Sequence, residues 1–299
     1  MSTVLMPPDS VPQLSGSPPD AEPLALGSGI DLITDLGISG WEVRDQDDTG
    51  TCVAFAATAC CEILHRQKDA AVPAFSEQFL FWAIKTQTDD CWPTSYWTKL
   101  GFARQALAGT GICHEKLLPT RMRAALPGST VAGSPPSAAA MADARASTCS
   151  QSLYYDIDQG GQKLEHLPEA AARLLQCLQA GQPAAISIPV FNRDGDPSSV
   201  NNWTTNGARY FGEVADPDPK RGWKICGSHA VCVTWALADN SDPLGVYFVV
   251  RNSWGPLWGR DFHKHGLPTS GYGRISASYV NNWCYEILQL GTSTTGSTS

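Results

Sequence analysis

A polar, glycine-containing turn leads directly into an apolar pattern at Gln46-Asp47-Asp48-Thr49-Gly50-Thr51-Cys52-Val53-Ala54-Phe55. From Cys52 to Arg66 the chain contains neither Gly nor Pro. Apolar residues recur there with the helical period of about 3.6 residues, at Val53, Ala56, Ala57, Cys60, Ile63 and Leu64. We therefore predict a helix from Cys52 to Arg66 with one buried face.

A cysteine is the first residue of this predicted helix. Thr51 is placed to cap the helix by accepting a hydrogen bond from a backbone N–H of the first turn. The positive end of the helix dipole favours the thiolate of Cys52, which is the form of cysteine that attacks a carbonyl carbon. The alternative is that Cys52 is a buried, unreactive thiol, as most free cysteines are. The position alone leaves both possibilities open.

Composition excludes several classes of function. The 299 residues are 42% hydrophobic and 17% charged, as in an ordinary globular protein. The net charge of −8 and the lack of a basic cluster argue against a nucleic acid or an anionic membrane as partner. No apolar run reaches the roughly 20 residues that a membrane span needs. The N-terminus does not resemble a secretory signal, so we expect a cytoplasmic protein or one exported without a cleavable signal.

The ten cysteines show no spacing typical of a zinc site, and a chain of this length does not need disulfides to fold. We expect most of them to be reduced and buried, with Cys60 and Cys61 facing different ways on their helix. Asp194-Gly195-Asp196 resembles a fragment of a calcium loop, but the spacing does not continue and a polar turn explains it better. We therefore predict no metal and no cofactor.

The chain divides into three parts. Residues 1–40 are rich in Pro, Ser and Gly and are predicted to form an extended arm, in which only Ile30–Ile33 is apolar enough to dock. Residues 41–290 form the folded domain, with a helical half at about 41–150 and a strand-rich half at about 151–290. The Thr/Ser/Gly-rich tail at 291–299 is predicted to be disordered.

Local patterns predict the elements of the domain. Further helices are predicted to begin at Ser76, which is a plausible N-cap, and to cover Gly101–Ala108, Ala138–Ala146 and Leu167–Ala180. Strands are predicted at Trp41–Arg44, Ala184–Val190, His229–Trp235, Val246–Arg251 and Gly271–Ile275. The predicted class is α+β.

Two of these strands predict a catalytic pair. The polar loop between them suits a hairpin, and in an antiparallel pair the first residue of one strand lies opposite the last residue of the next. His229 would open the first strand, and Asn252 follows the second. An imidazole that is held by a neutral amide is an oriented general base. With Cys52 at a helix N-terminus, the roles of nucleophile, base and orienting residue are all filled.

Three separate motifs in this order resemble the papain family of cysteine peptidases, over roughly residues 41–290. The first has Gln46 six residues before Cys52, and the second is Ser228-His229-Ala230-Val231. The third and most specific is Arg251-Asn252-Ser253-Trp254-Gly255-Pro256-Leu257-Trp258-Gly259. The resemblance implies a two-lobed papain-like fold, with a helical lobe, an antiparallel barrel-like lobe and the active-site cleft between them.

The resemblance also implies roles for individual residues. Cys52 is the nucleophile, His229 the base and later the acid, and Asn252 the orienting residue. Gln46 donates to the oxyanion beside the backbone N–H of Cys52, a kind of contact worth about 3 kcal/mol in the transition state. The implied substrate-binding residues are Gly50, Gly101, Ser228 and Trp254, and Trp254 also shields the His–Asn hydrogen bond from water.

The sequence departs from the family pattern at several points. Thr49 stands where the family has a disulfide cysteine, and Val53 replaces an aromatic residue. Asp47 and Asp48 place negative charge near the thiolate, which opposes the helix dipole. Long insertions near 121–150 and 192–225 separate Cys52 from His229. Trp92, Trp97, Trp203 and Trp223 either line a substrate groove or pack their loops.

The function implied by the resemblance is a monomeric cysteine endopeptidase that acts on peptides or proteins through a covalent thioester. The altered neighbours of Cys52 favour an alternative, a catalytically weak papain-fold protein that binds a partner. An exopeptidase or a transferase with the same triad is a third possibility. In the family an N-terminal propeptide is often inhibitory, so the arm at 1–40 is a candidate inhibitory segment that crosses the cleft.

Overall fold

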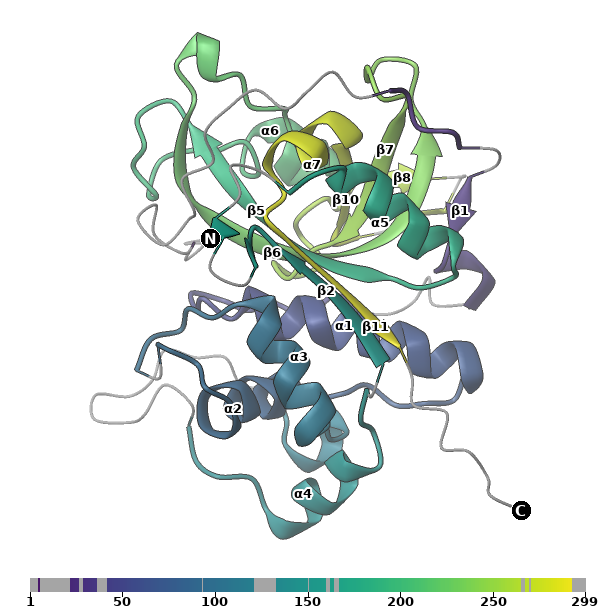
Figure 1. Cartoon of the computed structure of the whole chain (residues 1–299), viewed down its shortest axis with the longest axis vertical. Helices are drawn as coiled ribbons and strands as arrows, with labels where there is room; N and C mark the ends of the chain where they lie inside the picture. The colour runs from purple at the N-terminus through teal and green to yellow at the C-terminus, as the bar shows by residue number, and fades with distance from the viewer. Residues whose placement is uncertain are drawn as a thin grey trace.

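The computed structural model describes Leu5 and residues 22–26, 29–36, 42–92, 94–120, 133–149, 151–159, 162–163, 167–264, 267–268 and 270–291. Most of the predicted arm, and the predicted tail after Gly291, lie outside the described residues. The described chain has a helical lobe and a lobe built on an antiparallel sheet, as Figure 1 shows. The predicted α+β class and the two-lobed arrangement are confirmed.

The described residues of the helical lobe form four helices, and most of their ends match the predicted signals. They are α1 (Cys52–Lys68), α2 (Glu77–Gln87), α3 (Leu100–Gly109) and α4 (Ala138–Arg145), with a 3₁₀ turn η4 at Glu115–Leu117. The Ser76 hydroxyl accepts from the N–H of Phe79, as expected of an N-cap. Thr51 occupies the N-cap position of α1 but does not cap it, because its hydroxyl pairs with that of Thr49 at 2.9 Å.

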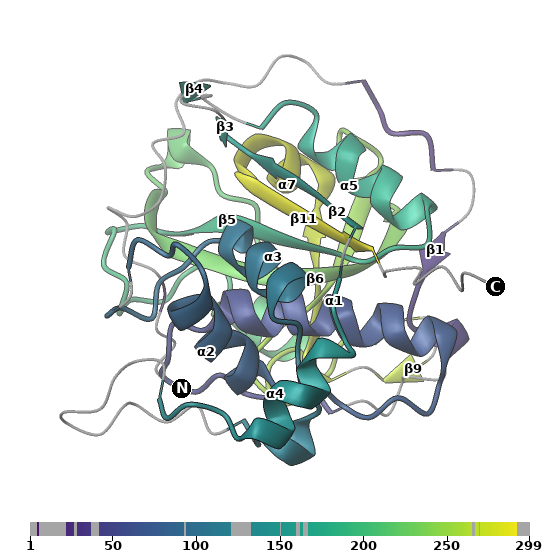
Figure 2. The ribbon, with the colours of Figure 1, turned by 60° about the horizontal axis from the view of Figure 1, so that its bottom comes forward.

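Helix α1 is buried on all sides over its first thirteen residues, from Cys52 to Leu64. The predicted single buried face is therefore wrong. The reason lies in its position, since α1 contacts α2 and α3 on one side and strands β5 and β6 of the sheet on the other. Figure 2 shows α1 running between the sheet and the other helices. Small residues such as Ala, Cys and Thr let neighbours approach it from every direction.

The second lobe is built on an open sheet with the strand order β10-β7-β6-β5-β11-β2, in which every neighbouring pair is antiparallel. Its strands are β2 (Gln151–Asp156), β5 (Ala184–Asn192), β6 (Lys224–Ala238), β7 (Val246–Arg251), β10 (Tyr272–Ser276) and β11 (Glu286–Gly291). Two short ribbons pair β3 (Asp158–Gln159) with β4 (Gln162–Lys163) and β8 (His263–Lys264) with β9 (Leu267–Pro268). Helices α5 (Ala170–Gln179), α6 (Asn206–Phe211) and α7 (Ala277–Trp283) complete the lobe, with a 3₁₀ turn η5 at Pro219–Arg221.

Strand β6 is much longer than predicted, and this changes the hairpin geometry. It begins at Lys224, five residues before His229, so His229 does not open the strand. The last residue of β7, Arg251, pairs with Cys232. His229 and Trp254 each lie three residues beyond this pair, so they face one another where β7 has ended. Asn252 reaches His229 diagonally, which is a normal distance for side chains on one face of an antiparallel pair.

The docking segment predicted in the arm is present. Strand β1 (Ile30–Asp31) pairs with β6 at Ala236 and Trp235, and it leads into a 3₁₀ turn η2 at Thr34–Leu36. Ile33 is 1% exposed. The arm is therefore attached, by this segment, to the end of β6 that is remote from His229.

Other predictions need correction. Residues 42–44 form no strand, and only Asp45 makes an isolated bridge, to Trp254. Helix α5 begins at Ala170, because Glu169 before it has a left-handed conformation with φ 53°. Within the described ranges no helix is both long and apolar enough to cross a membrane.

Candidate active site

His229 and Asn252 form the centre of the site. The Nε2 atom of His229 lies 2.7 Å from Oδ1 of Asn252, so the ring donates its Nε2 proton to the amide carbonyl. This leaves Nδ1 as the nitrogen that is free to accept a proton. The backbone N–H of Ser253 also donates to the same Oδ1 at 2.8 Å, which fixes the orientation of the amide.

Two tryptophans contact the imidazole, and a third packs against both of them. Trp254 stacks on His229 with ring centroids 4.5 Å apart and an angle of 26° between the planes. Trp203 meets the same ring edge-on at 5.4 Å, and it stacks on Trp258. Trp203 is fully buried, so of its two possible roles the structure supports packing. His229 and Asn252 are buried beside this cluster, so their hydrogen bond lies in a low-dielectric environment. A hydrogen bond in such an environment is stronger than one exposed to water.

Cys52 lies at the N-terminus of α1, against the strand that carries the histidine. The backbone N–H of Ala230, the residue after His229, acts on the Cys52 sulfur and lowers its pKa. The N–H groups of Val53 and of Cys52 itself have the same effect, as expected at a helix N-terminus. Among the hydrogen bonds of the described residues, none joins the thiol to the imidazole of His229.

Burial outweighs these donors in setting the protonation of the site. Burial raises the pKa of the Cys52 thiol to about 11, and it lowers the pKa of His229 to about 4, with the Asn252 hydrogen bond opposing that shift. The helix N-terminus therefore lowers the pKa of Cys52, as expected, but burial raises it by more. A neutral thiol and a neutral imidazole are the forms present at pH 7.

Glu286 is a buried carboxylate that acts on Cys52 and that sequence reasoning missed. Its charge raises the pKa of Cys52, although burial is the larger cause. Asp47 and Asp48, which we expected to act on the thiolate, are exposed instead. Glu286 accepts from the hydroxyl of Tyr154 at 2.5 Å. No local sequence pattern identifies Glu286 as a residue of the site, because strand β11 comes near Cys52 only through long-range strand pairing.

Gln46, six residues before Cys52, is held from two sides. Its Oε1 accepts from the Ser253 hydroxyl at 2.6 Å, and its Nε2 donates to the carbonyl of Thr49 at 2.5 Å. The side chain is 1% exposed. An amide nitrogen carries two protons, so one N–H of Gln46 remains for an oxyanion.

The other predicted substrate-binding residues are placed as follows. The Ser228 hydroxyl pairs with the hydroxyl of Tyr285. Gly50 is buried, and a Cβ there would lie 3.1 Å from Cβ of Tyr96. Gly101 lies inside α3, where a Cβ would meet the Tyr154 ring at 3.0 Å. Packing therefore accounts for Ser228 and Gly101, and these contacts give no support to a role in substrate binding.

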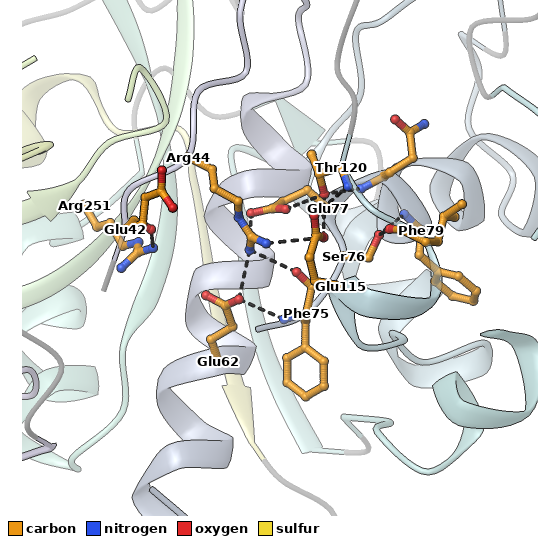
Figure 3. A network of polar contacts seen from close by, with 12 residues as sticks. Glu42, Arg44, Glu62, Phe75, Ser76, Glu77, Phe79, Glu115, Thr120 and Arg251 are labelled. Carbon is orange, nitrogen blue, oxygen red and sulfur yellow. Dashed lines mark hydrogen bonds and ion pairs between the residues drawn. The ribbon is translucent and has the colours of Figure 1, made fainter. Parts of the chain in front are cut away.

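A network of charges behind the site links the segment before Gln46 to the helical lobe (Figure 3). Arg44 contacts the carboxylates of Glu62 at 2.9 Å, Glu77 at 2.6 Å and Glu115 at 3.3 Å. It also donates to the carbonyl of Phe75 at 2.9 Å. Burial raises the pKa of Glu77, and Arg44 opposes this shift. The network fixes the position of the chain two residues before Gln46.

The described residues contain no group of three or more His, Cys, Asp or Glu side chains arranged to hold a metal ion. All ten cysteines are free thiols. The groups that the described residues bring to the site are a thiol, an imidazole, amides and backbone N–H groups.

Comparisons with known proteins agree on the fold. No protein-family model matches the sequence, and no curated protein matches it. Among solved structures, xylellain, a cysteine protease from Xylella fastidiosa, aligns over 98% of this chain and 97% of its own, with a TM-score of 0.68 and 19% identity. The bromelain protease from Ananas comosus aligns over 90% of this chain and 100% of its own, with a TM-score of 0.52 and 18% identity.

Digestive procathepsin L 3 of Tenebrio molitor aligns over 94% of this chain and 75% of its own, with a TM-score of 0.54 and 17% identity. These structures share their architecture with this chain at low identity. The chain has the papain-like fold of these cysteine proteases, with a loose similarity to xylellain.

Proposed function

We propose that the chain is a cysteine endopeptidase that hydrolyses peptide bonds through a thioester on Cys52. The observation that carries this proposal is the 2.7 Å hydrogen bond between His229 and Asn252, beside a cysteine at a helix N-terminus. The fold adds support, because the similar structures named above are cysteine proteases.

The geometry supports a general-base mechanism. As the Cys52 sulfur attacks the carbonyl carbon of the substrate, Nδ1 of His229 accepts the thiol proton, and Asn252 stabilises the imidazolium. The carbonyl oxygen becomes an oxyanion that accepts from the N–H of Cys52 and from the side chain of Gln46. His229 then protonates the leaving amine. In the second half, His229 activates a water molecule that hydrolyses the thioester.

The test is hydrolysis of a mixed fluorogenic peptide library by the full chain and by two matched variants. Cys52→Ala removes the proposed nucleophile, whereas Cys177→Ala removes a cysteine that is just as buried but lies on α5. We expect turnover to be lost only in Cys52→Ala. Equal turnover by both variants would reject the proposal. Peptides blocked at both ends distinguish an endopeptidase from an exopeptidase, which needs a free end.

One observation favours a second candidate, a papain-fold protein that binds a partner without catalysis. Cys52 and His229 are both fully buried, and burial favours the neutral form of each. If neither the full chain nor Cys177→Ala turns over any peptide while both still fold, this second function replaces the first.

A further inference from the structure

Two adjacent cysteines of α1 each meet a distant cysteine. Cys60 lies 3.4 Å from Cys232 of β6, and Cys61 lies 3.5 Å from Cys149, both measured between sulfur atoms. The two pairs point in different directions from the helix, as the sequence predicts. Neither pair is bonded, and neither belongs to the candidate active site.

The surroundings of the Cys61–Cys149 pair differ from those of an inert core thiol. His65 and Lys68 follow Cys61 at helical spacings of four and seven residues, so they share its face of α1. The hydrogen bond from Cys61 is the largest cause that lowers the pKa of Cys149, to about 6. Burial opposes this effect, and His65 and Lys68 reinforce it. These effects favour a thiolate at Cys149 over one at Cys61.

The Cys60–Cys232 pair supplies an internal comparison. Its sulfur atoms are equally close, and both residues are 0% exposed. Burial and Cys232 raise the pKa of Cys60. By contrast, Thr148, which precedes Cys149, is only partly buried, whereas the residues on either side of Cys60 and of Cys232 are buried.

We propose that Cys61 and Cys149 form a peroxide-sensitive dithiol, in which Cys149 is the reacting thiolate and Cys61 the resolving thiol. The Cys149 thiolate attacks one oxygen of hydrogen peroxide, which forms a sulfenic acid and releases hydroxide. The Cys61 sulfur then attacks the sulfenic sulfur, a disulfide forms and water leaves. Each peroxide accepts two electrons from the two thiols.

The disulfide would join two parts of the helical lobe that are far apart in sequence, helix α1 and the chain that follows α4. Cys149 follows α4, and its backbone N–H donates to the carbonyl of Leu107 in α3 at 3.2 Å. A bond from Cys149 to Cys61 therefore ties α1 to the end of α3 and closes a loop of more than eighty residues. Such a long loop gives a disulfide a large stabilising effect. We expect the oxidised protein to unfold at a higher temperature than the reduced one.

The experiment uses the full chain carrying Cys52→Ala, so the result does not depend on peptidase activity. The protein is treated with hydrogen peroxide, alkylated, digested and analysed by mass spectrometry. We expect a peptide pair joined through Cys61 and Cys149, while Cys60 and Cys232 remain alkylatable after unfolding. The exposed Cys91 reports that the oxidant has acted. Oxidation of Cys91 without the 61–149 linkage, or a 60–232 linkage formed first, would overturn the proposal.

Two conservative variants test the assigned roles. Cys61→Ser should leave Cys149 as a sulfenic acid that dimedone traps, whereas the matched Cys60→Ser should leave the 61–149 disulfide unaffected. His65→Gln should slow formation of the disulfide by roughly tenfold at pH 7, because the thiolate fraction of Cys149 falls. An unchanged rate in His65→Gln would show that the imidazole of His65 does not promote formation of the disulfide.

Discussion

Asn252 holds His229 through its carbonyl oxygen, at 2.7 Å, while its buried Nδ2 atom has no hydrogen-bond partner. Leaving a buried N–H donor without a partner costs about 1–3 kcal/mol. We therefore expect the carbonyl oxygen of Asn252 to have a functional role that offsets this cost. We infer that the amide orients the imidazole without giving it a charged neighbour.

This arrangement predicts different outcomes for two substitutions. Asn252→Ala removes the orienting acceptor, and we expect kcat to fall on the order of 10²-fold with little change in KM. Asn252→Asp keeps an acceptor but adds a negative charge, which raises the pKa of His229 above its value of about 4. The acidic limb of the pH–rate profile should therefore move to higher pH in Asn252→Asp.

Asn281→Ala provides the control, because this residue of α7 is a buried asparagine outside the site. Steady-state kinetics from pH 3 to pH 9 give both readouts. Equal losses of kcat in Asn252→Ala and Asn281→Ala would mean that the effect is a general loss of structure.

The protonation of Cys52 gives a second prediction. Burial raises the pKa of this thiol to about 11, so the thiolate fraction should grow with pH throughout the neutral range. We expect the rate of alkylation of Cys52 by iodoacetamide to rise about tenfold per pH unit between pH 7 and pH 10. Peptide mapping separates Cys52 from the exposed Cys91. A plateau below pH 7 would contradict this, because it would indicate a thiolate–imidazolium pair.

Sequence alone predicted the local parts of the fold well. Helix α2 begins where the predicted N-cap Ser76 caps it, because a cap depends only on residues within one turn. Helix α4 begins at the predicted Ala138. Strand β7 has the predicted ends, Val246 and Arg251. The neighbourhood of His229 and Asn252 was also predicted correctly, although the reasoning placed His229 at a strand end that lies five residues earlier.

The features that sequence did not predict depend on distant parts of the chain. Strand β11 pairs with β2 and β5, and only this pairing brings Glu286 toward Cys52. The raised pKa of Cys52 likewise follows from burial by both lobes, whereas the sequence displays only the favourable helix N-terminus. A local sequence pattern shows which groups are adjacent along the chain, but it does not show how deeply the fold buries a side chain.

The charge network around Arg44 gives a third prediction. One guanidinium, 20% exposed, balances the carboxylates of Glu62 and Glu77, which are nearly buried. Arg44→Met leaves these carboxylates unpaired, and we expect a loss of about 3–5 kcal/mol in the free energy of unfolding. The free energy of unfolding of Arg44→Lys should lie between those of the unsubstituted protein and Arg44→Met, because an ammonium group keeps the charge but cannot make the same forked contacts.

Arg274→Met is the matched control. Arg274 contacts Glu213 at the same distance of 2.9 Å, but the two side chains are 40% and 54% exposed. Exposed pairs contribute about 0–1 kcal/mol. Urea unfolding followed by tryptophan fluorescence measures both variants. Similar midpoints for Arg44→Met and Arg274→Met would show that the Arg44 network adds little to stability.

The fourth prediction concerns the proposed inhibitory arm, whose docked and remaining parts should behave differently. Strand β1 pairs with β6 at Trp235 and Ala236, at least six residues from His229, which corresponds to about 20 Å along the strand. The docked segment is therefore too far away to cover the nucleophile. Leu24 likewise donates to the carbonyl of Leu244, in the loop between β6 and β7, so we expect any inhibition to come from residues before Glu22. A chain of 21 residues can span up to about 70 Å, enough to reach the cleft.

Deleting residues 1–21 should then raise kcat/KM, with only the small loss of stability that follows from removing one buried side chain, Leu5, which is 6% exposed. A synthetic peptide of residues 1–21 should inhibit the truncated protein. Deleting residues 1–40 also removes Leu32 and Ile33, which are 8% and 1% exposed, and should cost about 3 kcal/mol of stability. Comparing the two deletions separates loss of inhibition from loss of structure. Unchanged kcat/KM after the shorter deletion would show that the arm does not restrain the enzyme, because that deletion leaves β1 in place.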